Sequence, residues 1–350
     1  MADTGFLPKE KIKTLLEALS SKYHVFVPTQ QGGVVLFRPY AADATICFDR
    51  PANLPPKSVI FPQSETLFTF SYRKDTENSG KASVELMENL EVPATLIFGC
   101  RPCDAEGFAI LDRVYVDTDI PDPYYRNRRE KTTIVSLACE APSPGCFCTA
   151  VGRGPAAKEA SDLLMTEIQN GFFFEAVTEK GKAVLQSELF EDGSDYQEQA
   201  KQAQEKAAEG MRKPFSSTED IPQKVLARFE DDAFWGSEAE KCISCGACTY
   251  LCPTCYCFNI TDEQVGANGE RIRSWDSCMF YHFTLEASGH NPRSSKHQRL
   301  KNRVGHKFSY YPSKYNGVIA CCGCGRCIRY CPASVDISEI VSHCQEHTNG

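Results

Sequence analysis

One cysteine spacing occurs twice in the second half of this chain, and it constrains the fold more than any other feature. The first copy reads Cys242-x-x-Cys245-x-x-Cys248-x-x-x-Cys252-Pro253. The second copy reads Cys321-x-x-Cys324-x-x-Cys327-x-x-x-Cys331-Pro332. Spacings this short let one tight loop aim three thiols at a common point, and the proline then turns the chain away. Each copy therefore predicts a cysteine-ligated metal centre.

The spacing is typical of domains that bind two [4Fe–4S] clusters, in which the fourth cysteine of each copy ligates the other cluster. The predicted ligands of one cluster are Cys242, Cys245, Cys248 and Cys331, and those of the other are Cys321, Cys324, Cys327 and Cys252. Structural zinc is the alternative, but zinc sites favour two well-separated cysteine pairs that close one tetrahedron. Two identical runs fit the two-cluster hypothesis better.

Length, charge and hydropathy limit the class of protein. The chain has 350 residues, enough for two domains, and 19 cysteines. It shows no apolar run of the roughly 20 residues needed to span a membrane and no signal-peptide core. We therefore expect a cytoplasmic protein, in which reducing conditions favour metal ligation over disulfides. The net charge of −8 argues against general nucleic-acid binding.

The predicted fold class is α+β. Residues 1–195 are expected to form an α/β domain with cysteine-bearing loops, 196–225 a helical connector, and 226–350 a mostly helical ferredoxin-like domain. A long insertion, 253–320, separates the two cysteine runs. The charged, Ala- and Gln-rich stretch 196–213 predicts a helix that we expect to face solvent. Ser237-x-x-Glu240 predicts a capping box just before the first run.

Two apolar runs, 94–99 and 132–138, predict buried strands of an open sheet, and each leads directly into cysteines. Ligands usually bind at the carboxyl ends of such strands. A helix is expected over 105–115. Residues 163–167 and 172–177, around Asn170-Gly171, predict a hairpin with a type I′ turn.

Four thiols at these strand ends are candidates for a third metal site: Cys103, Cys139, Cys146 and Cys148. Cys146-x-Cys148 is a usable chelating pair. The alternative is a purely structural role, in which all four cysteines are small buried side chains. Cys100 is a possible substitute for Cys103, and Asp104 is a possible oxygen ligand.

Six further cysteines have less definite roles. Cys255, Cys257 and Cys278 follow Cys252 and must lie near the cluster that it serves. They are candidates for ligands of another cluster, for buried thiols, or for hydrogen-bond partners that tune a neighbouring cluster. Cys47, Cys322 and Cys344 have no partner pattern and are expected to be structural.

Basic residues accumulate around the second cysteine run. Residues 287–335 contain no Asp or Glu, and the cations there are Arg293, Lys296, Arg299, Lys301, Arg303, Lys307, Lys314, Arg326 and Arg329. A charge run is usually a solvated face. Beside thiolate-ligated clusters it can also stabilise the reduced state or dock an acidic partner, and 293–307 is our candidate docking surface. Nucleic acid ranks last because no binding motif accompanies the charge.

No motif for substrate chemistry is evident. Gly152-x-Gly154-Pro155 superficially resembles a dinucleotide fingerprint but follows a cysteine-rich loop, so we interpret it as a turn. The chain shows no phosphate-binding loop and no nucleophile elbow. We therefore expect a non-catalytic electron-transfer subunit. Two other classes stay open: a structural iron–sulfur interaction protein, and an enzyme with its own site at the extra thiols.

Several motifs together resemble a known family: 101–115, the loop Cys139 to Cys148, 242–257, 275–280 and 321–332. Over most of its length the chain looks like the iron–sulfur beta subunit of soluble NAD(P)-linked hydrogenases (sulfhydrogenases) and the A subunit of anaerobic sulfite reductase. Related subunits accompany flavin-containing oxidoreductases that are linked to heterodisulfide-reductase-like complexes, and the resemblance implies anaerobic metabolism.

The resemblance implies electron transport between a flavin-containing subunit that oxidises NAD(P)H and a terminal reductase or hydrogenase-type subunit. It also implies two [4Fe–4S] clusters on the eight ferredoxin-type cysteines, and it favours a third on Cys103, Cys139, Cys146 and Cys148. An anaerobic sulfite reductase A subunit proper is the alternative identity. Neither nucleic acid nor a membrane is expected among the partners.

Overall fold

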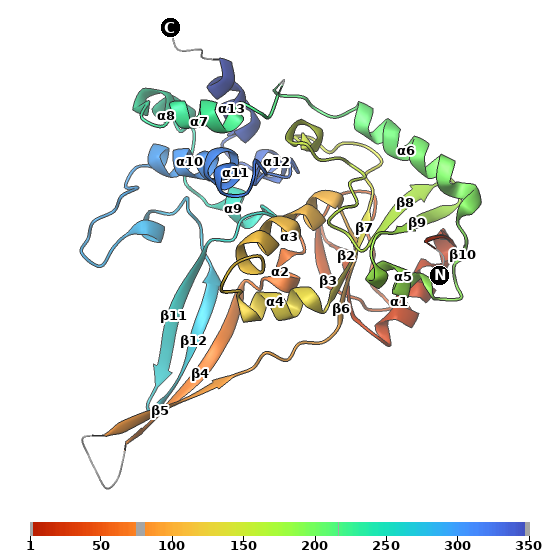
Figure 1. Cartoon of the computed structure of the whole chain (residues 1–350), viewed down its shortest axis with the longest axis horizontal. Helices are drawn as coiled ribbons and strands as arrows, with labels where there is room; N and C mark the ends of the chain where they lie inside the picture. The colour runs from red at the N-terminus through yellow and green to blue at the C-terminus, as the bar shows by residue number, and fades with distance from the viewer. Residues whose placement is uncertain (1–2, 75–80, 216, 347–350) are drawn as a thin grey trace.

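The computed structural model describes residues 3–74, 81–215 and 217–346. Helices and sheets are mixed in an α+β arrangement, with the termini on different sides of the molecule (Figure 1). An eight-stranded sheet occupies the N-terminal region, helices gather around the cysteine runs, and a four-stranded sheet projects away from both. In the described residues, no helix is both long and apolar enough to cross a membrane.

The large sheet has the strand order β10-β1-β9-β8-β7-β6-β2-β3. Its centre, β8-β7-β6-β2, is parallel, and the flanking pairs are antiparallel. Every residue of β6 and β7 is buried, as expected for parallel strands covered on both faces. The strands are β1 (Thr4–Pro8), β2 (His24–Gln31), β3 (Val34–Pro39), β6 (Thr95–Cys100), β7 (Thr132–Leu137), β8 (Leu163–Ile168), β9 (Gly171–Ala176) and β10 (Glu191–Asp192).

Helices pack on this sheet through apolar stripes. Leu15, Leu16 and Leu19 of α1 are buried in the same core as strand residues Leu96 and Val135. The helices of this region are α1 (Ile12–Ser20), α2 (Lys57–Ile60), α3 (Pro102–Tyr115), α4 (Pro123–Glu130), α5 (Glu179–Leu185) and α6 (Gln197–Glu209). Short 3₁₀ turns lie at Lys9–Lys11, Cys148–Val151, Ser194–Tyr196 and Tyr281–Thr284.

The expected strand–cysteine–helix order is present where β6 leads into α3. Arg101 is the N-cap of α3, and its backbone N–H donates to the Asp104 carboxylate at 3.2 Å. Pro102 occupies the first helical turn, where a missing N–H costs nothing. This cap fixes Cys103 at the carboxyl end of the buried strand, facing the loop that follows β7.

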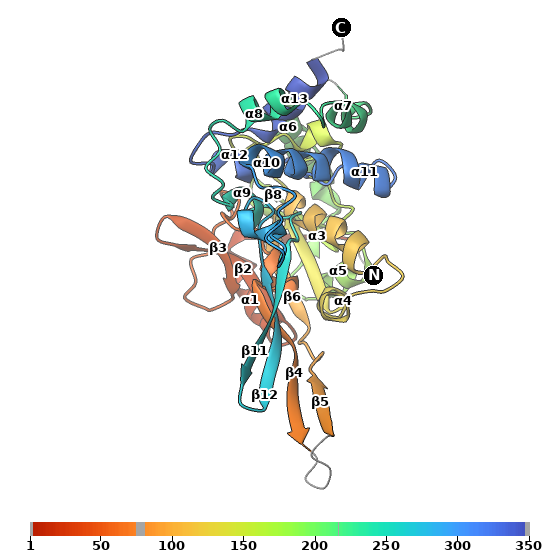
Figure 2. The same ribbon diagram turned by 90° about the vertical axis from the view of Figure 1, so that its left-hand side faces the viewer.

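A projecting arm is the part of the fold that the sequence did not predict. Its strand order is β11-β12-β4-β5, so the insertion between the cysteine runs pairs with a hairpin from the N-terminal region (Figure 2). Buried Arg273 anchors the arm, because its Nε donates to Glu65 at 2.8 Å and its guanidinium pairs with Asp122. The strands are β4 (Ser64–Lys74), β5 (Ala82–Glu88), β11 (Phe258–Val265) and β12 (Asn268–Trp275).

The C-terminal region is a set of short helices around one core. Trp235, Val304 and Val341 are fully buried there, together with Phe147 from the N-terminal cysteine loop. The two regions of the chain therefore share a hydrophobic core. The helices are α7 (Ile221–Ala227), α8 (Asp232–Glu238), α9 (Ala247–Tyr250), α10 (Lys296–Gly305), a π-helical turn (His306–Tyr310), α11 (Tyr311–Lys314), α12 (Arg326–Arg329) and α13 (Ile337–Glu346).

Three local predictions need correction. The hairpin is present as β8–β9, but its loop is Gln169-Asn170 and neither residue has a positive φ, so the turn is not type I′. Ser237 lies near the end of α8, which is capped by Asp231, so the capping box is wrong. Helix α6 buries Ala200 and Ala207 and packs on β8, so the helix is not simply solvent-facing.

Candidate iron–sulfur centres

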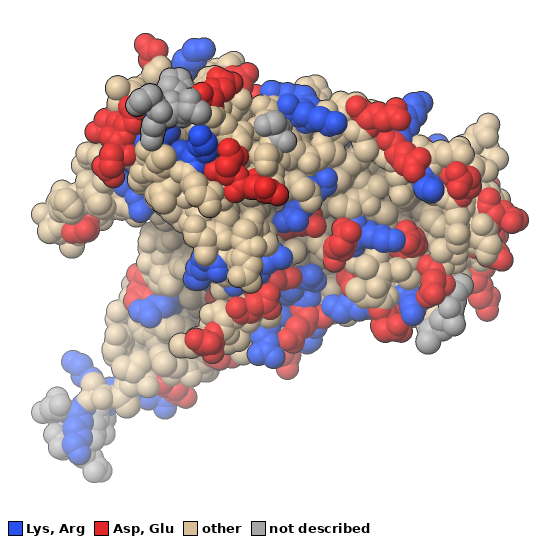
Figure 3. Space-filling model, turned by 45° about the horizontal axis from the view of Figure 1, so that its top comes forward, with Lys and Arg blue, Asp and Glu red and all other residues tan. Residues whose placement is uncertain are grey.

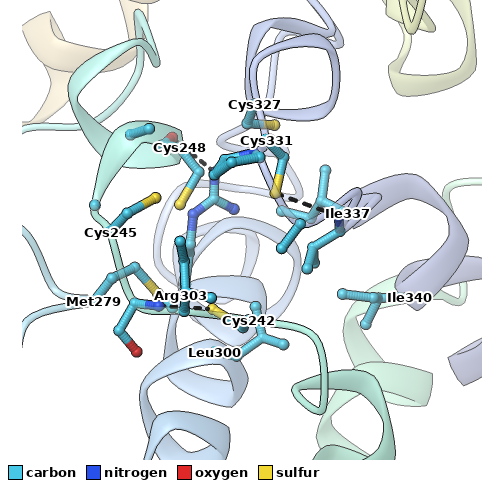
Figure 4. Close-up of a pocket in the computed structure, with 17 residues that line it drawn as sticks. Cys242, Cys245, Cys248, Met279, Leu300, Arg303, Cys327, Cys331, Ile337 and Ile340 are labelled. Atoms are coloured by element: carbon cyan, nitrogen blue, oxygen red, sulfur yellow. Dashed lines mark hydrogen bonds between the residues drawn. The ribbon is translucent and has the colours of Figure 1, made fainter.

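The first-run cavity is lined by Cys242, Cys245, Cys248 and Cys331 (Figure 4). The fourth thiol thus comes from the second cysteine run, as the crossed arrangement predicts. Backbone N–H groups donate to two of these sulfurs: Ser244 to Cys242 at 3.4 Å and Val335 to Cys331 at 3.3 Å. N–H···S hydrogen bonds of this kind are one of the factors that set the reduction potential of a bound cluster.

The second-run cavity is lined by Cys321, Cys324, Cys327 and Cys252. Here the fourth thiol comes from the first run, so the exchange is reciprocal. The Gly323 N–H donates to the Cys321 sulfur at 3.5 Å. Cys322, expected to be structural, also lies on this wall and is hydrogen-bonded to Cys324.

The N-terminal cavity brings together all four cysteines predicted for a third site: Cys103, Cys139, Cys146 and Cys148. Cys100 is not among its lining residues, because it points into the sheet core, where its sulfur lies 3.5 Å from the Ser136 hydroxyl. Asp104 is engaged in a buried ion pair with Arg326, with an oxygen–nitrogen distance of 2.6 Å. The alternatives that used Cys100 and Asp104 as ligands are therefore not supported by this geometry.

The three cavities lie in series because neighbouring cavities share wall residues. Cys324 lines both the N-terminal cavity and the second-run cavity. Cys327 and Arg303 line both the second-run cavity and the first-run cavity. A line of adjoining thiol-lined sites therefore runs from the strand ends of the large sheet to the first cysteine run.

Backbone contact locks the N-terminal cysteine loop onto the second run. Phe147 N–H donates to Gly323 O at 2.8 Å. Gly323 has a φ of +63°, and a Cβ there would lie 2.6 Å from Cys148 Cα. Gly325 is equally tight, since its Cβ would lie 2.4 Å from Gly145 C. Only glycine fits where these two loops cross.

We expect Gly323→Ala to separate these loops and to release iron from the N-terminal site. The added methyl group meets backbone, which cannot swing aside as a flexible side chain can. Gly266→Ala is the matched control, because Gly266 also has φ +63° but nothing within 4 Å. Both variants pay roughly 1–2 kcal/mol for the left-handed backbone, so only Gly323→Ala should lose iron. Equal iron content of the two proteins would contradict the prediction.

The basic stretch is largely internal. Arg299, Arg303 and Lys307 are only 7%, 3% and 3% exposed. Arg299 donates to Met279 O, Arg303 to Cys248 O and Lys307 to the Thr254 hydroxyl. On the face drawn in Figure 3, basic side chains are interspersed with acidic ones. The prediction that 293–307 is a docking surface is therefore wrong for these three residues, which support the cavities instead.

The donor set fits iron–sulfur clusters. Arg303 Nε is buried without a hydrogen-bond partner and lies on the wall between two thiol-lined cavities. Within residues 3–74, 81–215 and 217–346, neither Arg303, Lys307 nor Lys57 forms an ion pair with a carboxylate. Buried cations require negative charge nearby, and thiolate-ligated clusters would supply it.

The thiols that line the cavities have pKa values shifted in both directions. Hydrogen bonds from Cys255 and Cys322 lower the pKa values of Cys252 and Cys324, whereas burial raises those of other cavity thiols. Burial raises the pKa of Cys148 and of Cys321 to about 12 each. Burial also raises the pKa of Cys139 and of Cys103. Metal binding must therefore release protons from these cysteines.

In the described part of the chain, no three His, Cys, Asp or Glu side chains converge closely enough to hold a single metal ion.

Sequence reasoning missed Lys57, which is a buried cation beside the thiols of Cys252 and Cys255. This lysine is 3% exposed, lies 4.0 Å above the Trp275 ring and donates to Cys255 O at 2.9 Å. Burial lowers the pKa of Lys57 to about 8, while Cys255 and Cys252 oppose that shift. No local signal marks it, because it reaches the thiols from a short helix almost two hundred residues away in sequence.

Comparisons with known proteins agree with this geometry. A family model described as a 4Fe-4S dicluster domain matches residues 241–335. The chain is 31% identical over 304 residues to sulfhydrogenase 2 subunit beta of Pyrococcus furiosus, which covers 84% of this chain and 83% of that protein. No solved structure matches the chain significantly.

Proposed function

The chain belongs to the family of iron–sulfur beta subunits that includes sulfhydrogenase 2 subunit beta, and from that premise we propose a specific electron route. The protein is an iron–sulfur electron-transfer subunit of an oxidoreductase. In the proposed route it passes single electrons between a flavin-containing, NAD(P)H-oxidising subunit and a terminal reductase or hydrogenase-type subunit. The cytoplasm is its proposed location.

The series of three thiol-lined cavities is the observation that carries this proposal. A structural cluster needs no neighbour, whereas a relay needs centres that adjoin one another. Cys324 on one shared wall, and Cys327 with Arg303 on the other, put each site directly against the next. A [4Fe–4S] cluster bound in each cavity would accept and donate one electron at a time.

The chain's own residues set the conditions for this transfer. The twelve proposed ligands are Cys242, Cys245, Cys248 and Cys331; Cys321, Cys324, Cys327 and Cys252; and Cys103, Cys139, Cys146 and Cys148. Buried Arg303 and Lys307 offset the added negative charge of reduction. Apolar Met279, Leu300 and Ile340 exclude water from the first-run cavity.

One end of the series reaches the surface. Cys245 is exposed, and the neighbouring side chain Ile243 is 66% exposed. An apolar side chain beside an exposed ligand is suited to contact with a partner protein. We therefore assign this loop, rather than 293–307, as the place where electrons leave or enter at the first-run cavity.

Anaerobic analysis of the isolated chain tests the relay. We expect about twelve iron per chain and reversible uptake of about three electrons, because three cubanes each take one. We also expect no NAD(P)H oxidation by the isolated chain, and NAD(P)H-dependent reduction once its flavin-containing companion from the native complex is added. A value near eight iron atoms per chain would mean that the N-terminal site holds no cluster. Clusters that do not cycle, or NAD(P)H oxidation by the chain alone, would contradict the relay.

Crossed ligation gives a separate expected result. Cys252→Ser should damage the cluster of the second run, and Cys331→Ser should damage that of the first run, because each thiol lies in the other run's cavity. Cys344→Ser is the control, since this buried thiol lies in the helical core outside the three cavities. Electron paramagnetic resonance of the reduced variants distinguishes the clusters. Damage confined to the same-run cluster would refute the crossed assignment.

A further inference from the structure

Cys257 and Cys278 form a thiol pair outside the three cavities. Cys257 precedes β11 and Cys278 follows β12, and the two strands pair down to Phe258 and Trp275. Beyond that pair, Asp276 N–H donates to Cys257 O at 2.9 Å, which holds the two chain segments together. The two thiols are hydrogen-bonded to each other, and the Cys278 backbone N–H also bonds Cys257.

The surroundings of the pair are suited to thiol chemistry. Cys278 is buried in the helical core, while Cys257 packs on that core and is partly exposed. The hydrogen bond from Cys278 lowers the pKa of Cys257 to about 7, and Lys307 and Lys57 act in the same direction. A thiolate fraction near neutral pH makes Cys257 the nucleophile of the pair.

Position separates this pair from the cluster sites. The proposed cluster ligands surround the three cavities, whereas Cys257 and Cys278 line none of them. Cys255 lies near both this pair and Cys252 of the second-run cavity, because it is hydrogen-bonded to Cys252 and its charge raises the pKa of Cys278.

We propose that Cys257 and Cys278 are a redox-active dithiol–disulfide pair, a two-electron site beside the row of one-electron centres. Oxidation forms one S–S bond and releases two protons and two electrons, and reduction reverses each of these changes. The protons leave through the partly exposed Cys257. The electrons pass singly to the neighbouring iron–sulfur centres, and only this last step rests on the proposed function.

Differential thiol labelling tests the pair directly. The cluster-loaded chain is equilibrated anaerobically in glutathione buffers that range from reduced to oxidised, and thiol exchange is then stopped with acid. The chain is denatured, and a first alkylating reagent labels every free thiol. After reduction, a second reagent marks only cysteines that were in disulfides. We expect both Cys257 and Cys278 to change from the first to the second label in one two-electron transition. Cys344, buried without a cysteine partner, should keep the first label throughout.

Peptide mass spectrometry of the wild-type chain does not depend on any variant folding. In Cys257→Ser we expect Cys278 to keep the first label while the iron content is unchanged. Retention of the first label on both cysteines in every buffer would overturn the proposal. Loss of iron in both Cys257→Ser and Cys278→Ser would overturn it too, and would make them ligands of a further cluster. A disulfide that forms while the clusters fail to cycle would sink the proposed function alone.

Discussion

Asp104→Asn is expected to lower the melting temperature of the cluster-loaded chain by about 4–7 °C. Asp104 pairs with Arg326 at 2.6 Å, and each side chain is about 1% exposed. Removing one partner of a buried pair leaves an uncompensated charge, which costs roughly 3–5 kcal/mol. A chain of 350 residues unfolds with an entropy of about 0.7 kcal/mol/K, so each kcal/mol shifts the melting temperature by about 1.4 °C and the loss gives the stated shift. Anaerobic melting at a fixed scan rate measures it, since unfolding releases the clusters irreversibly.

Two further variants isolate the cause. Asp104→Asn combined with Arg326→Met removes both charges and should recover most of the loss, because replacing a whole buried pair is often neutral. Glu130→Gln is the matched control: its i,i+4 partner Arg126 and Glu130 itself are 50% and 57% exposed, so less than about 1 kcal/mol is at stake. If the Asp104→Asn and Glu130→Gln variants have the same melting temperature, the buried pair of Asp104 and Arg326 does not hold the N-terminal and C-terminal regions together.

The sequence predicted the parts of this protein that depend on local spacing. The cysteine runs sit in short loops whose geometry follows from their own residues, and the buried strands before Cys103 and Cys139 are continuous apolar runs. The four N-terminal thiols were predicted as a group because each follows a strand end. These features need no knowledge of distant contacts, so a single sequence is sufficient to find them.

Apart from the crossed cysteines, whose spacing belongs to a known motif, features that depend on distant contacts were not predictable. The arm joins β4 to β12 across some two hundred residues, and no turn or period in either strand announces that pairing. The sequence also does not reveal which basic side chains point into the protein and which point to solvent. Arg299 and Lys296 are neighbours in one basic run, yet the first is buried against Met279 O and the second is exposed. Charge counting predicted a docking surface where side-chain packing places internal support.

Arg303→Met is expected to lower the reduction potentials of the clusters in the first-run and second-run cavities by about 90 mV. The Arg303 guanidinium is 3% exposed and lies on the wall that these cavities share. A unit charge roughly 8 Å from a centre, at an effective dielectric constant of about 20, contributes ~2 kcal/mol. For one electron, this energy corresponds to ~90 mV. Because the site is buried, the shift should change little with ionic strength.

Potentiometric titration followed by electron paramagnetic resonance measures both potentials, and two variants separate charge from packing. Arg303→Lys keeps the cation and should retain most of the potential. Lys301→Met removes a charge from the same helix, but Lys301 donates to Phe229 O and lines neither cavity, so its shift should be much smaller. Unchanged potentials in an iron-replete Arg303→Met protein would contradict the assignment. Then the unpartnered Nε–H of Arg303 would need an acceptor other than a cluster.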